Sequence, residues 1–151
     1  MVSNNERLKE AVRDIIEKPL QSEGCELADL AISQYKKGST VRLFVYCENG
    51  VTLGKCASLS SLIGAVIDGT DLFVNGYTLE ISSPGLDRPL SKVLDFKYRI
   101  GEIVKLNFAK RNRPAVRAKI ISVSDSKIVF ENESGAFTEE LTNIEKAKIV
   151  Y

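Results

Sequence analysis

The sequence predicts an α+β protein of two unlike domains, an N-terminal α/β domain and a C-terminal all-β domain. Three observations carry this prediction. Helix-like and strand-like periodicities succeed one another through the first half, a segment rich in proline and glycine interrupts the middle, and five short strand-like runs follow at close spacing. A chain of 151 residues can form one domain or two small ones. The interruption favours two, over residues 1–83 and 91–151, with a rigid linker over residues 84–90.

The first domain is predicted to run helix, strand, strand, helix, strand. Ser3 and Glu6 have the form of a capping box, so an amphipathic helix begins there, and Pro19 and Gly24 mark its decline. Thr52 is placed to cap a second, strongly apolar helix. The predicted strands cover residues 27–33, 40–47 and 77–81. This order predicts helices packed on one face of a small sheet.

The middle segment combines two prolines with a glycine. Pro84 and Gly85 fit the central positions of a type II turn, in which glycine takes a positive φ. Pro89 disfavours a helical conformation at Arg88, so the segment should be extended and stiff. Asp87 and Arg88 either form a locking or docking ion pair or are simply solvated, and the residues alone favour solvation. The linker signature comprises Ser82, Ser83, Pro84, Gly85, Leu86, Asp87, Arg88 and Pro89.

The second domain begins with a short helix and is otherwise built of strands. Ser91 is placed to cap a helix over residues 92–99, and Gly101 ends it. The predicted strands cover residues 102–108, 115–123, 127–131, 136–141 and 147–151. Five short strands in this length predict a small closed barrel of the SH3-like or Sm-like type, which leaves no free sheet edge.

Basic residues are concentrated in the second half. The net charge is +1, but residues 1–91 hold 9 basic against 12 acidic residues, and residues 92–151 hold 12 against 8. No acidic residue lies between Lys105 and Lys119. This pattern predicts a surface that contacts RNA phosphate or an acidic protein, although a charged surface that only protects sheet edges is the alternative. The candidate contact residues are Lys105, Lys110, Arg111, Arg113, Arg117 and Lys119.

Residue types argue against most enzymatic mechanisms. Histidine is absent, which removes the commonest general base and the commonest metal ligand. A nucleophile at Ser82 or Ser83 would need a base, and the Gly-x-Ser-x-Gly elbow is missing. We therefore predict no catalytic residue, no metal site and no cofactor.

The cysteines and the apolar segments bear on the compartment. Cys25, Cys47 and Cys56 are odd in number and lack Cys-x-x-Cys spacing, so we predict small buried hydrophobes and neither a disulfide framework nor a zinc site. The sequence has no apolar run of membrane-spanning length, and its first residues lack the pattern of a signal peptide. These features predict a cytoplasmic protein with no membrane partner, and a monomer is the default.

Three stretches together resemble the bacterial ribosome maturation factor RimP family. They are Gly50-Val51-Thr52-Leu53 followed by Cys56, the contiguous run from Tyr77 to Leu90, and the ending from Asn143 to Val150. The resemblance implies an N-terminal α/β domain, a C-terminal SH3-like barrel and no enzymatic activity. It also implies a role in late maturation of the small ribosomal subunit, through the free subunit and the small-subunit protein of the decoding centre. One departure is that Gly54 and Lys55 stand where the family commonly has acidic residues.

The leading hypothesis is therefore an assembly factor required for maturation of the small (30S) ribosomal subunit, which acts by non-catalytic binding to the immature subunit. Its partners would be rRNA and the decoding-centre ribosomal protein. The alternative is a generic RNA-binding or RNA-chaperone module without a ribosomal role. Relative binding to ribosomal particles and to arbitrary structured RNA distinguishes the two.

Overall fold

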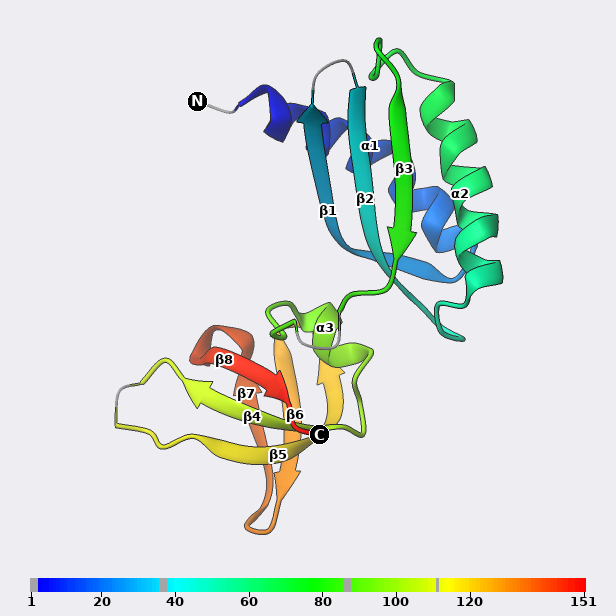
Figure 1. Cartoon of the computed structure of the whole chain (residues 1–151). Helices are drawn as coiled ribbons and strands as arrows, with labels where there is room; N and C mark the ends of the chain where they lie inside the picture. The colour runs from blue at the N-terminus through cyan, green and yellow to red at the C-terminus, as the bar shows by residue number, and fades with distance from the viewer. Residues whose placement is uncertain (1–2, 36–37, 86–87, 111) are drawn as a thin grey trace. The chain divides into compact units, whose positions relative to one another are not determined.

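The chain forms two compact units in the computed structural model, which describes residues 3–35, 38–85, 88–110 and 112–151. The units are Met1–Pro84 and Gly85–Tyr151 (Figure 1). Leu90 belongs to the second unit, because its side chain is buried in that unit's core and its N–H donates to the Ala147 carbonyl over 2.9 Å. A separate rigid linker over residues 84–90 stays a prediction.

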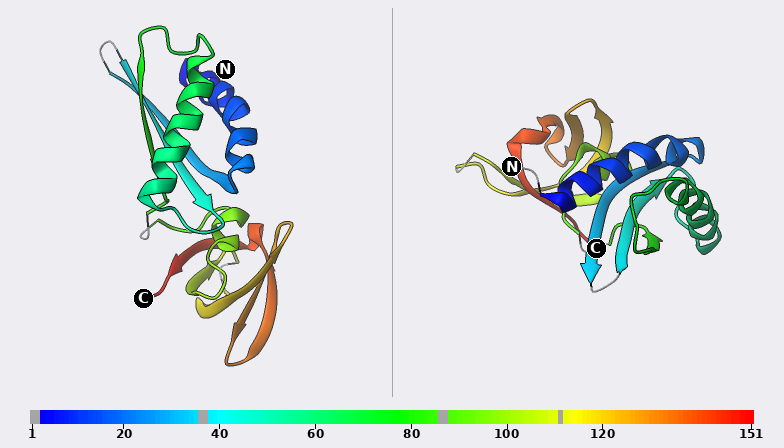
Figure 2. Two further views of the ribbon diagram at one scale, coloured as in Figure 1. Left: turned by 90° about the vertical axis from the view of Figure 1, so that its right-hand side faces the viewer. Right: turned by 90° about the horizontal axis from the view of Figure 1, so that it is seen from above.

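The first unit is a three-stranded sheet with two helices on one face. Its elements are α1 (Asn4–Ser22), β1 (Cys25–Tyr35), β2 (Gly38–Cys47), α2 (Leu53–Asp68) and β3 (Tyr77–Ser82). The strand order is β1-β2-β3, with β1 antiparallel and β3 parallel to β2. Figure 2 shows α1 and α2 beside each other against the same side of the sheet. Val41, Leu43 and Val45 of β2 alternate along the strand and are fully buried.

The two predicted N-caps are confirmed. The Glu6 N–H donates to Ser3 Oγ over 3.1 Å, and the Lys55 N–H donates to Thr52 Oγ1 over 3.0 Å. The first helix continues past Pro19 and ends at Ser22, between the two residues that were predicted to mark its decline. Proline removes one backbone donor, and burial of Leu20 at 0% exposure offsets that loss.

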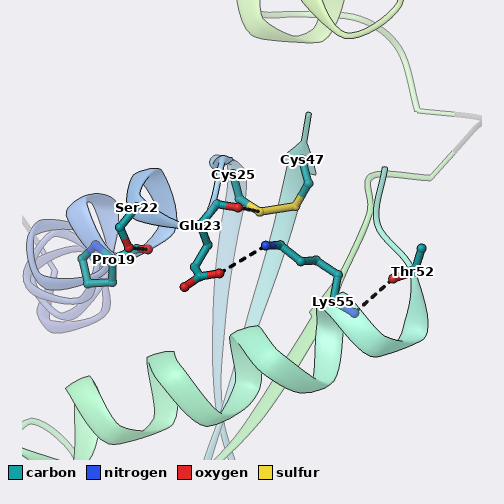
Figure 3. A network of polar contacts seen from close by, with 7 residues as sticks. All are labelled: Pro19, Ser22, Glu23, Cys25, Cys47, Thr52 and Lys55. Carbon is teal, nitrogen blue, oxygen red and sulfur yellow. Dashed lines mark hydrogen bonds and ion pairs between the residues drawn. A yellow bond between two sulfur atoms is a disulfide. The ribbon is translucent and has the colours of Figure 1, made fainter. Parts of the chain in front are cut away.

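The prediction that the cysteines are unpaired was wrong for two of them. Cys25 and Cys47 are directly opposite each other in the β1–β2 ladder, with their Cα atoms 4.1 Å apart, and a disulfide joins them (Figure 3). Both are buried, as predicted. The pairing was missed because the two residues are 22 positions apart and only the strand register brings them together. Cys56 is a free thiol.

The second unit is an antiparallel sheet with one short helix. Its elements are α3 (Val93–Lys97), β4 (Ile103–Phe108), β5 (Val116–Ser124), β6 (Lys127–Asn132), β7 (Gly135–Glu140), a 3₁₀ turn (Leu141–Asn143) and β8 (Ile144–Ile149). The strand order is β7-β6-β5-β4-β8. Over the described residues no ladder joins β7 to β8, so closure of the predicted barrel is not confirmed. Phe96 of α3 packs edge-to-face on Phe130 of β6, with ring centroids 6.1 Å apart.

Two details of the middle segment differ from the predictions. Gly85 does not have the positive φ that a type II turn demands at that position. Its carbonyl instead accepts from the Arg88 N–H over 3.1 Å. Ser91 does not cap α3 with its side chain, because the carboxylate of Asp95 accepts the Ser91 and Lys92 N–H groups, each over 3.0 Å. A buried carboxylate therefore holds the start of the helix.

Candidate nucleic-acid interface

The outer face of strands β4 and β5 carries the basic residues that the sequence singled out. Alternation decides which side chains point outward: Val104 and Leu106 are fully buried, whereas Lys105 between them is exposed. Arg117 and Lys119 flank the buried Ala118 in the same way on β5. Lys105 is directly opposite Arg117 in the β4–β5 ladder. Two predicted contact residues are therefore neighbours on one surface.

Strand β8 adds two lysines that the sequence analysis missed. It lies on the other side of β4 (Figure 1), where Lys148 is opposite Lys105 and Lys146 is opposite Asn107. Both lysines are exposed and flank the buried Ala147. The Lys-Ala-Lys alternation in a predicted strand was the available signal, but only the ladder shows that β8 pairs with β4.

We call Lys148, Lys105 and Arg117 the cationic row, because they lie opposite one another on three adjacent strands. Adjacent strands are about 4.8 Å apart, so the row spans about 10 Å. With Lys119 and Lys146 it forms the cationic face. None of these five side chains makes an ion pair with another described residue. The acidic residues near the edges of this face are Glu131, opposite Lys119, and Glu145, at the irregularity in β8.

Arg113 lies on the β4–β5 connection, and unlike the side chains of the cationic face its guanidinium contacts other residues of the second unit. Its guanidinium carbon is 3.6 Å from the centre of the Phe108 ring, and Nη2 donates to the buried carboxylate of Glu139 on β7. These contacts tie the connection to a strand at the far end of the sheet. Arg113 is thus placed as a structural residue.

The other residues of this connection are less constrained. Lys110 is exposed and its side chain makes no ion pair with another described residue. Arg111 lies outside the described residues. Among the described residues, the basic side chains that the structure brings together are those on the strands.

Arg88 of the linker signature is half-buried and faces the second unit's own helix. Its Nη2 lies 4.0 Å from Oδ2 of Asp95, a carboxylate that is almost completely buried. The arrangement differs from a simply solvated charge, which the residues alone favoured. Asp87 lies outside the described residues, so the structure does not test whether it pairs with Arg88 or is solvated.

The start of α2 forms a second polar cluster, which Figure 3 shows. Lys55, which stands where the family pattern is commonly acidic, has its Nζ 3.3 Å from Oε2 of Glu23. Both line a surface pocket of about 240 Å³ together with Glu48. Because the lysine charge is balanced by these carboxylates, the pocket is a poor anion site.

Tyr77 joins the end of α2 to the sheet. Its hydroxyl lies 2.8 Å from Oδ1 of Asp68 and 3.1 Å from the Gly64 carbonyl. Burial, together with the hydrogen bond to Asp68 and the charge of that carboxylate, raises the pKa of Tyr77 to about 12. Asp68 is therefore engaged in a structural contact.

The described part of the chain has neither a metal-binding cluster nor a helix that could span a membrane. No group of three or more His, Cys, Asp or Glu side chains is arranged to hold a metal ion there. None of the helices in that part has the length and hydrophobicity to cross a membrane.

Comparison with protein families gives an independent assignment for the first half. Residues 15–87 match the model of the RimP N-terminal domain. The match covers most of the first unit, including the strand β3 and the start of the proline-rich segment. The first half of this chain therefore carries the N-terminal domain of the RimP family, a family of ribosome maturation factors.

Proposed function

We propose that this chain assists maturation of the small ribosomal subunit by binding the immature subunit without catalysing a reaction. The observation that carries the proposal is the cationic face, on a chain whose other half is a RimP N-terminal domain. An assembling subunit presents dense RNA phosphate, and cations that lack ion-pair partners gain free energy by displacing the counterions of that phosphate.

The second unit is proposed to be an SH3-like barrel. Its strand order β7-β6-β5-β4-β8 and the 3₁₀ turn before β8 support this proposal. The register also shifts between Ile120 and Ser122, in the central strand β5. Such a bulge bends a strand and lets it serve two sides of a small barrel.

The remaining parts of the proposal concern partners and compartment. The family resemblance supports binding to rRNA and to the ribosomal protein of the decoding centre. Assembly of bacterial subunits takes place in the cytoplasm, which is the compartment we propose. The chain is proposed to act as a monomer.

Co-sedimentation tests the proposal. The purified full-length protein would be mixed with immature small subunits, mature small subunits and an unrelated structured RNA of similar length, at low salt and at physiological salt. The proposal expects recovery with the immature particle in preference to the other two. Equal recovery with the unrelated RNA would favour a generic RNA-binding or RNA-chaperone module. Absence from all three pellets would refute both functions.

A further inference from the structure

The cationic face is costly for the fold. Like charges directly opposite each other on adjacent strands destabilise a sheet. The cationic row places Lys105 between two such neighbours, Lys148 and Arg117. Each charge of the row lies about 4.8 Å from the next, within the Debye length of about 8 Å at physiological salt, so neighbouring charges repel each other. A sheet face selected only for stability would place opposite charges next to each other, as Glu131 is opposite Lys119, and the cationic row does not.

The five cations form a surface that fits a polyanionic backbone. Lys119 is two residues from Arg117 on β5, and Lys146 is two residues from Lys148 on β8, which places each about 7 Å along its strand. The cations therefore cover two dimensions of one sheet face. A single small phosphate would engage few of them, whereas a chain of phosphates can contact most of them together.

The neighbouring side chains indicate which form of RNA fits. Single strands are held by aromatic side chains on which the bases stack. The outward positions between and beside these cations carry Asn107 and Ile103, which cannot stack a base. The ring of Phe108 is in the core and is covered by Arg113. Tyr151 is exposed, but it lies beyond the end of β8.

We propose that the cationic face binds the sugar–phosphate backbone of double-helical RNA, without reading its sequence. This inference rests on the proposed function for its biological setting, but the chemistry belongs to the face itself. Lys105, Arg117 and Lys148 make the central phosphate contacts, and Lys119 and Lys146 extend them. Arg113 is not part of the contact, because Glu139 and Phe108 already occupy its guanidinium.

The test measures binding of the full-length protein to labelled RNA by fluorescence anisotropy over a series of salt concentrations. The probes are two RNA duplexes of about 20 base pairs with unrelated sequences and one single strand of the same length. We expect similar affinity for both duplexes, at least ~10-fold weaker binding to the single strand, and a linear fall of log affinity with log salt. Tighter binding to the single strand would overturn the inference.

Charge-neutral variants locate the contact. The triple variant K105Q/R117Q/K148Q should bind the duplex at least ~10-fold more weakly and reduce the salt slope by about 3, or about 1 for each lost contact. The matched control K9Q/K18Q/K127Q loses the same charge from α1 and β6 and should change the affinity less than ~3-fold. Equal losses in both variants would show general charge attraction and overturn the assigned surface.

Thermal unfolding shows whether weaker RNA binding of the triple variant comes from a folding defect. Neutralising the cationic row removes repulsion, so the triple variant should melt at the same temperature as the parent or higher. If the triple variant were unfolded, K105Q alone would carry the test, with an expected slope reduction of about 1.

The experiments can refute the proposed ribosomal function and the proposed binding of double-helical RNA independently of each other. If neither duplex binds while the protein still co-sediments with immature subunits, the double-helix inference is wrong and the proposed function stands. If duplexes bind but immature subunits are not preferred over unrelated RNA, the inference stands and the ribosomal function is wrong.

Discussion

The two sheets of this protein differ in the charges of residues that lie directly opposite each other on adjacent strands. In the first unit, Arg42 of β2 is directly opposite Glu80 of β3 on the sheet face away from the helices, and their side chains form an ion pair of 2.6 Å. In the second unit, Lys105 of β4 has a cation directly opposite on each side. Both sets of side chains are exposed, so burial does not explain the difference.

The comparison separates charges that are paired within the fold from charges that we propose contact a partner. Opposite charges in cross-strand pairs contribute a few tenths of a kcal/mol, up to about 1 kcal/mol, and like charges cost a similar amount. The first sheet satisfies its charges internally. The second sheet leaves a positive potential, which is only useful if an anion is brought to it.

Replacing Arg113 should give the largest loss of stability. It also distinguishes a structural arginine of the second unit from the residues of the cationic face. The change R113A leaves the buried carboxylate of Glu139 without its cation and uncovers the Phe108 ring. Because Arg113 is partly exposed, we expect a loss of about 1–3 kcal/mol in unfolding free energy, below the cost of breaking a fully buried pair. Urea denaturation measures it. Duplex RNA affinity of the folded variant should change less than ~3-fold, and a large loss would place Arg113 in the interface after all.

Reversing one charge of the Arg42–Glu80 ion pair should destabilise the first unit. The change R42E makes a like-charge pair with Glu80 and should cost about 1 kcal/mol. The double reversal R42E/E80R should recover most of that loss, which a double-mutant cycle measures. RNA binding should be unaffected by the double reversal because the net charge is unchanged. Failure of the second change to restore stability would show that the ion pair contributes nothing.

The opposite change in the second sheet should convert its charge pattern to that of the first. In K105E a carboxylate stands between Lys148 and Arg117. We expect a gain of roughly 0.5 kcal/mol in unfolding free energy together with at least ~10-fold weaker binding to duplex RNA. Chemical denaturation and anisotropy measure the two effects on one sample. A destabilised variant would contradict the view that the row repels itself.

The pH dependence of Tyr77 gives the smallest effect and tests the paired chemistry of the first unit. Its pKa is raised to about 12 by burial, by the hydrogen bond to Asp68 and by the charge of that carboxylate, whereas an unfolded tyrosine titrates near pH 10. The stability from this contact is therefore complete below pH 10 and is lost as the pH rises through 12. The parent should lose stability relative to Y77F over that interval. Parallel curves would contradict the raised pKa.

Local chemistry made much of the fold predictable from the sequence. The capping oxygens of Ser3 and Thr52 act within a single turn, so their positions could be identified without the fold. The acid-free run likewise predicted a basic surface in the second half, and Lys105 and Arg117 are exposed on β4 and β5.

The predictions missed contacts that residue type alone does not specify. Gly85 has the composition for a type II turn, yet its φ is not positive and its carbonyl accepts from the Arg88 N–H. Ser91 has the residue type of a cap, but the carboxylate of Asp95 accepts the free N–H groups. Arg113 belongs to an acid-free run, and Glu139, 26 residues away, supplies its counter-charge.

The sequence by itself determined that the chain has an α/β half and a strand-rich, basic half, since periodicity and residue type act over a few residues. Only the tertiary structure decided which charges meet. Strand register joins Cys25 to Cys47, gives Arg42 a glutamate partner, and sets Lys148 beside Lys105. The physical reason is that a ladder aligns residues by backbone hydrogen bonds, and the spacing of residues along the chain does not specify which strands will pair.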